Sequence, residues 1–80
     1  MQQASLGEMV HYILPKGRSK GQPRPAVVVR VWPDYKCNLQ VFTDDSNDDL
    51  PAIFWATRVE YSDDKVPGTW RFPSIVFEDV

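Results

Sequence analysis

The sequence predicts an all-β fold, a small SH3-like barrel of four to five antiparallel strands. The chain has 80 residues, which is enough for one domain only. Its 7 prolines and 4 glycines divide it into short segments, and no long segment keeps the apolar spacing of a helix without a breaker. The runs between these breakers are rich in β-branched and aromatic residues, which is typical of strands.

Five such runs are expected to form the strands, and the second is the strongest because it contains four valines. We expect one domain over residues 1–80, with its core within about 8–73 and a C-terminal tail at 74–80. In chain order the runs are Met9–Leu14, Ala26–Trp32, Asn38–Thr43, Ile53–Tyr61 and the short Thr69–Phe72.

The connections between these runs favour an SH3-like layout. A first strand is followed by the long basic loop Pro15–Pro25, and then by a three-stranded meander with a turn at Pro33–Lys36. The acidic loop Asp44–Pro51 and the turn Ser62–Gly68 complete the set. An OB-like barrel is the alternative, but it usually has a helix between its third and fourth strands, and Asp44–Pro51 is short for one.

Alternation along each strand assigns residues to the two faces of the sheet. One face carries mostly aliphatic residues and is expected to form the core. Its members are Val10, Tyr12, Leu14, Val27, Val29, Val31, Leu39, Val41, Trp55 and Val59.

The opposite face mixes hydrogen-bonding side chains with large apolar ones. Such a mixture suits a binding surface, although arginine stems that cover aromatic rings on an ordinary outer face would give the same pattern. The polar members are His11, Arg30, Gln40 and Arg58, and the apolar ones are Val28, Trp32, Phe42 and Phe54.

Charge is divided unevenly along the chain. Residues 1–36 carry six basic and two acidic groups (+4), residues 37–80 carry three basic and nine acidic groups (−6), and the sum is −2. The basic excess lies in Pro15–Pro25, where arginines are suited to hold a phosphate or carboxylate. The acidic second half argues against duplex nucleic acid as a partner. No apolar run is long enough for a membrane span and no secretory signal is visible, so no membrane partner is expected.

Metal and catalytic chemistry have little support in the sequence. The single cysteine, Cys37, and the single histidine, His11, cannot form a disulfide or a four-ligand zinc site, and Cys37 is expected to be buried or half-buried. An EF-hand loop beginning at Asp45 would have Leu50 in place of glycine and Ala56 in place of glutamate. No hydrolase, phosphate-binding or metalloprotease motif is present, so we expect no enzyme, no cofactor and no metal.

Five blocks of the sequence, VHYILP, RPAVVVRVW, NLQVFTD, WATRVEYS and PGTW, span about residues 9–72. Together they resemble a family of small uncharacterised proteins encoded by tailed bacteriophages and prophages. The resemblance implies a phage origin and a setting in the host cytoplasm. It brings no established active site, so no functional residue is carried over.

We therefore expect a non-catalytic phage binding protein, an anti-defence factor that sequesters an anionic nucleotide-type ligand or masks a host protein. A ligand held between subunits would gain burial, which favours a homo-oligomer. The alternative is a small structural or assembly component of the virion. In the ligand hypothesis, phosphates are held by Arg18, Lys20, Arg24 and Arg30, the base stacks on Trp32 or Tyr35, His11 or Gln40 reads an edge, and Arg58 completes the surface.

Overall fold

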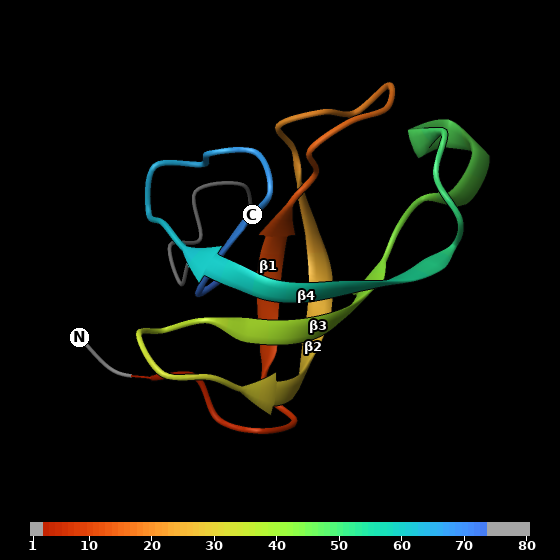
Figure 1. Cartoon of the computed structure of the whole chain (residues 1–80). Helices are drawn as coiled ribbons and strands as arrows, with labels where there is room; N and C mark the ends of the chain where they lie inside the picture. The colour runs from red at the N-terminus through yellow and green to blue at the C-terminus, as the bar shows by residue number, and fades with distance from the viewer. Residues whose placement is uncertain (1–2, 74–80) are drawn as a thin grey trace, which may run out of the picture.

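The chain forms a closed barrel of five strands, seen in a computed structural model that describes residues 3–73 (Figure 1). The predicted tail at 74–80 lies outside the described residues. The elements are β1 (Met9–Ile13), β2 (Pro23–Val31), β3 (Cys37–Phe42), the one-turn 3-10 helix η1 (Asp45–Asp48), β4 (Ile53–Tyr61) and β5 (Thr69–Arg71).

Consecutive strands β1 to β4 pair antiparallel, and the barrel closes through β5. β5 pairs antiparallel with β1 and, over Glu60 and Tyr61, parallel with β4. The predicted all-β barrel is thus confirmed, and the architecture is consistent with an SH3-like or OB-like barrel. The predicted β4 range is reproduced, and β2 begins at Pro23 instead of Ala26 because the chain already pairs with Ile13 there.

The barrel interior contains six of the predicted core residues and several that were not predicted. The largest fully buried side chain is Trp70 of β5, and Ile13 and Cys37, the latter predicted to be buried or half-buried, are also sealed from solvent. The confirmed members are Val10, Tyr12, Leu14, Leu39, Val41 and Val59.

The predicted inward face of β2 is wrong. Ala26 and Val28 are buried, whereas Val29 and Val31 are 39% and 38% exposed and Val27 is half-buried. Alternation fixes which residues share a face, but it does not say which face is inside when valines occupy both. A register shift between Val28 and Arg30 then interrupts the alternation itself.

The prediction that Trp55 is in the core is also wrong, because β4 contains a bulge. Leu39 pairs with Ala56 but Cys37 pairs with Val59, so β4 has one extra residue between these pairs, and Arg58 has a positive φ of 49°. An extra residue reverses the alternation beyond it. Phe54 and Ala56 therefore pack against the core together with Val59, and Trp55 is left 59% exposed.

Candidate functional site

The structure places the predicted site residues in two groups at opposite ends of β2. The basic loop that precedes β2 lies at one end of the barrel beside η1, and the turn between β2 and β3 lies at the other (Figure 1). Because Arg24 and Arg30 lie near opposite ends of β2, their Cα atoms are about 20 Å apart at the rise per residue of an extended strand. The first end holds Arg18, Lys20 and Arg24, the second holds Arg30, Trp32, Tyr35 and Arg58, and His11 and Gln40 lie in the strands between them.

At the first end, Arg24 is committed to a carboxylate of the protein itself. Its Nε and Nη2 donate to both oxygens of Asp48 at 2.7 Å each, and the Asp48 side chain is fully buried. The backbone N–H of Asp44 and the hydroxyl of Ser19 also donate to this carboxylate. These donors, Arg24 first, hold the pKa of Asp48 well below its usual range.

Arg18 of the basic loop also pairs with the acidic loop, but this ion pair lies at the surface. Arg18 Nη2 lies 3.1 Å from Asp49 Oδ1 in a solvent-exposed pair. Gly17 has a φ of +89°, and a Cβ placed on it would lie 2.3 Å from the carbonyl oxygen of Asp48. Arg18 and Arg24 are therefore paired with aspartates of the acidic loop, and the nine residues expected from the sequence do not gather in a single site. Lys20 is exposed at this end.

At the second end, two guanidinium groups lie over one indole ring. The Cζ atoms of Arg30 and Arg58 are 4.0 and 4.3 Å from the centroid of the Trp32 ring. Neither arginine forms an ion pair with a carboxylate in the described residues. We call Arg30, Trp32 and Arg58 the Trp32 platform. It has two positive charges that, among the described residues, form no ion pair with a carboxylate.

Asn38 fixes the orientation of this platform. Its side chain is buried, and its Oδ1 accepts hydrogen bonds from Trp32 Nε1 and from the backbone N–H of Arg58, each at 2.8 Å. One oxygen thus links the end of β2 to the bulge in β4. Sequence analysis missed Asn38, because no periodic or compositional signal separates it from a polar residue on an outer face.

Trp70 contacts the turn beside the Trp32 platform through a hydrogen bond. Asp34 and Tyr35 both have positive φ, 62° and 63°, so the predicted turn at Pro33–Lys36 is confirmed in a conformation that non-glycine residues seldom adopt. The Trp70 Nε1 donates to the Tyr35 carbonyl at 2.8 Å, and the backbone N–H of Trp32 donates to the Lys36 carbonyl at 2.8 Å. These bonds give the turn one defined position next to the ring.

A surface hollow of about 390 Å³ adjoins the platform. A volume of this size is in the range of small-molecule sites. Lys36 adds a third cation and Asp34 a carboxylate to its wall. The lining residues are Trp32, Pro33, Asp34, Lys36 and Arg58.

The two predicted residues in the middle of the sheet are separate from this hollow. Gln40 lies between Val27 and Trp55 in the cross-strand register, and His11 lies between Pro25 and Arg71. Partial burial, and then the charge of Arg71, lower the pKa of His11, so the imidazole is mainly neutral at pH 7. His11 therefore contributes little charge to anion binding.

Within residues 3–73, no group of three or more His, Cys, Asp or Glu side chains is arranged to hold a metal ion. Two aspartates of the acidic loop pair with arginines instead: Asp48, the last residue of η1, binds Arg24, and the next residue, Asp49, binds Arg18. The same described part of the chain contains no helix of the length and apolar character needed to cross a membrane.

Removing the Asn38 amide should loosen the platform. Asn38→Ala leaves the Trp32 and Arg58 donors without their acceptor, which should reduce the free energy of unfolding by about 1–3 kcal/mol. Urea unfolding measures this loss, and the Trp32 side chain should become more mobile in NMR relaxation. Asn47→Ala is the control, because Asn47 is exposed and bonds only Asp44 by its side chain. Equal losses for the two variants would contradict the role given to Asn38.

Comparison with known proteins gives no relative for this chain. No protein-family model matches it, and the searches of curated proteins and of solved structures find no match. The phage family therefore stays a prediction from the sequence blocks, and the candidate site rests on its geometry alone.

Proposed function

We propose that this chain is a non-catalytic binding protein that captures an anionic nucleotide-type ligand at the Trp32 platform. The observation that carries the proposal is the contrast between the two ends of the barrel. Arg18 and Arg24 are paired with aspartates, whereas Arg30 and Arg58 stack on an indole and form no ion pair within the described residues. Cations held ready beside an aromatic ring suit a phosphate joined to a base.

The chemistry of the platform allows both parts of a nucleotide to be bound. A guanidinium that stacks through its plane keeps its N–H edge for bidentate hydrogen bonds to a phosphate. Lys36 adds a point charge in the adjoining hollow. The outer plane of a guanidinium that stacks on Trp32 supports stacking of the base. Asp34, in the wall of the same hollow, offers an acceptor to a ribose hydroxyl or an exocyclic amine.

The biological setting of the proposal comes from the sequence blocks that resemble phage proteins. In that setting the chain is an accessory factor in the host cytoplasm that removes a nucleotide-type signal and so counters a host defence. It acts by binding and not by turnover, since the sequence contains no hydrolase or phosphate-transfer motif.

The test is a thermal-shift screen against cyclic and linear nucleotides, with inorganic phosphate as a separate arm. A nucleotide at about 100 times its Kd should stabilise the protein by about 2.7 kcal/mol and raise the melting temperature by about 10 °C or more. Arg30→Ala and Arg58→Asn should abolish this shift. Asn is chosen at Arg58 because it tolerates the positive φ of 49° there.

Arg18→Ala is the matched control, because it removes one positive charge at the opposite end of the molecule. It should keep the full ligand-induced shift. No shift with any nucleotide, or an equal loss in Arg18→Ala, would reject the proposal. A shift with phosphate alone would reduce the site to an anion site without base recognition.

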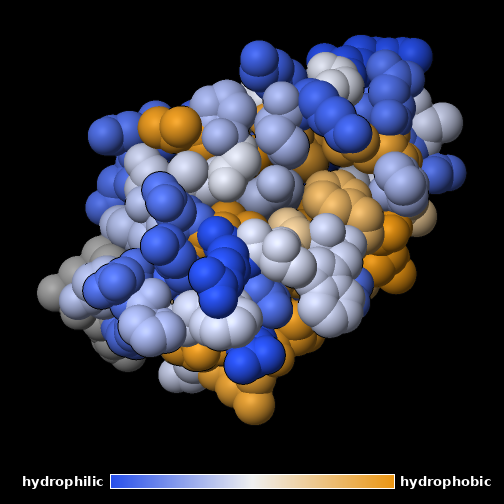
Figure 2. Space-filling model, in the orientation of Figure 1, coloured by the Kyte–Doolittle hydropathy of each residue, from blue (hydrophilic) through white to orange (hydrophobic). Residues whose placement is uncertain are grey.

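A second candidate function, a small structural or assembly component of the virion, is favoured by apolar side chains on the outer surface. Met9, Phe42, Ile53 and Trp55 are all more than one-third exposed. Figure 2 displays apolar surface between polar groups on one side of the molecule. A virion subunit should be found in purified particles and should show no nucleotide-induced shift.

A further inference from the structure

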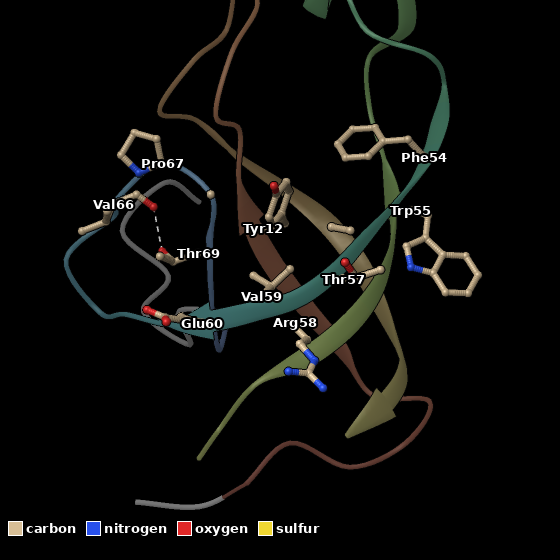
Figure 3. Close-up of a pocket in the computed structure, with 12 residues that line it drawn as sticks. Tyr12, Phe54, Trp55, Thr57, Arg58, Val59, Glu60, Val66, Pro67 and Thr69 are labelled. Atoms are coloured by element: carbon tan, nitrogen blue, oxygen red, sulfur yellow. Dashed lines mark hydrogen bonds between the residues drawn. The ribbon is translucent and has the colours of Figure 1, made fainter. Parts of the chain in front are cut away.

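Part of one strand edge of the barrel, in β4, pairs with no other strand of residues 3–73. β3 pairs with β4 from Ile53 to Val59, but on the other side of β4 the strand β5 reaches only Glu60 and Tyr61. Within the described residues, the segment Ile53–Ala56 therefore has a strand partner on one side only. Two surface hollows, of about 340 and 550 Å³, adjoin this segment and share Phe54 and Trp55. Figure 3 shows the larger of the two.

The register shows which backbone groups face the open side. The Thr43 N–H donates to the Ala52 carbonyl at 2.8 Å, which makes these directly opposite residues a hydrogen-bonded pair. Hydrogen-bonded and non-hydrogen-bonded pairs alternate along an antiparallel ladder. Phe54 and Ala56 therefore bond to β3, while the N–H and C=O of Ile53 and Trp55 point toward the open side.

This edge lacks the usual protection against strand pairing. Exposed edges are commonly blocked by lysine, proline or inward charges, but no charged or proline residue occurs from Ile53 to Thr57. Ile53 and Trp55 are instead 55% and 59% exposed. In Figure 3 the Trp55 indole points away from Tyr12 and Val59, out of the barrel.

We propose that the occupant of this edge is a second copy of the chain, whose own β4 pairs with it antiparallel about a two-fold axis at Phe54. In this register Ile53 of each copy lies opposite Trp55 of the other, so the outward N–H and C=O groups satisfy one another. The two exposed apolar side chains also cover each other on the same face of the joined sheet. The contact is self-complementary, as a two-fold interface requires.

Charge complementarity favours a second copy over an unrelated strand. The hollow at the start of β4 contains Lys16, and the hollow at its end contains Glu60. Antiparallel pairing brings the Lys16 end of one copy to the Glu60 end of its partner, twice per dimer. Neither residue forms an ion pair within residues 3–73. The pairing uses the β4 edge and does not require the anion site.

The test combines sedimentation velocity with amide hydrogen exchange. The protein should pass from monomer to dimer as its concentration rises. The amides of Ile53 and Trp55 should become protected over the same concentration range, whereas those of Phe54 and Ala56 are already protected by β3. A monomer at all concentrations would overturn the proposal. So would a dimer in which the Ile53 and Trp55 amides stay unprotected, because that dimer uses another surface.

Three variants sharpen the result. Trp55→Lys should weaken dimerisation by at least tenfold, whereas Met9→Lys should not, because Met9 is exposed on the same cross-strand row but three strands away. Lys16→Glu and Glu60→Lys should each weaken the dimer, and the double exchange should restore it. Failure of the double exchange to restore a dimer that each single change weakens would contradict the two-fold register.

Discussion

Replacing Arg24 with alanine is expected to lower the melting temperature by more than about 10 °C at pH 7. The substitution leaves the Asp48 carboxylate fully buried without the guanidinium that donates to both of its oxygens. Removing one partner of a buried ion pair is far more damaging than removing both. The loss should therefore appear as a cooperative decrease in stability, measured by calorimetry or circular dichroism.

Two controls separate this buried pair from ordinary surface charge. Arg18→Ala breaks the exposed pair with Asp49, whose side chains are 67% and 50% exposed, and should change the melting temperature little. The double variant Arg24→Met with Asp48→Leu should recover much of the loss, because no buried charge remains. Equal effects of Arg18→Ala and Arg24→Ala would contradict the importance given to the buried pair.

The same ion pair gives the effect of Arg24→Ala a pH dependence. The donors around Asp48 lower its pKa in the folded state. A lowered pKa means that the pair stabilises the fold above the unfolded value of about 3.9, and that this stabilisation is lost as the pH falls through the lower folded pKa. The difference between the natural protein and Arg24→Ala should therefore be full at pH 7 and shrink in strong acid.

Replacing Trp70 with alanine is expected to reduce the free energy of unfolding by about 3–5 kcal/mol. Trp70 is fully buried, and its ring meets those of Tyr61 and Phe72 edge-on at 4.9 and 5.1 Å. A domain of this length has a total stability of about 4–12 kcal/mol. Trp70→Ala should thus lose a large fraction of the total stability, which thermal unfolding measures directly.

Trp70→Phe separates packing from hydrogen bonding. It keeps an aromatic ring but removes the Nε1 donor to the Tyr35 carbonyl. We expect it to fold with a smaller loss of stability and to loosen the turn at Asp34 and Tyr35. Nucleotide binding at the neighbouring Trp32 platform should then weaken. A Trp70→Phe protein with unchanged turn dynamics would contradict the role of this bond in holding the turn.

The strands of the barrel could be predicted because the signals that mark each strand lie within a few residues of one another in the sequence. Breakers and β-branched runs mark the strands, and the long β4 run was bounded correctly at both ends. The inward face of β2 was not predictable, since Val27, Val28 and Val29 offer the same side chain to both faces. Trp55 was misplaced for a different reason, because the bulge beyond Ala56 reverses the alternation and leaves no mark in the composition.

Only some of the residues named for the candidate site are neighbours in the structure. Arg30, Trp32 and Arg58 were named from the sequence and do lie together. Arg18 and Arg24 were grouped with them because loop charge is visible in a sequence, whereas the aspartates that neutralise it are distant in the chain and become neighbours only in the fold. Asn38 was missed because its importance comes from two donors, in β2 and β4, that meet only in the closed barrel.

The bulge in β4 has a consequence for how the gene tolerates changes in length. Because the extra residue lies between Ala56 and Val59, the strand supplies the solvent side with Ile53 and Trp55 and the interior with Val59. Loss of the single Thr57 codon would restore unbroken alternation and place Val59 two positions after Ala56, still on the interior face. Both halves of the strand would keep their faces, so an in-frame deletion at the bulge should be tolerated, whereas a deletion in the regular part of the strand would turn one half of it over.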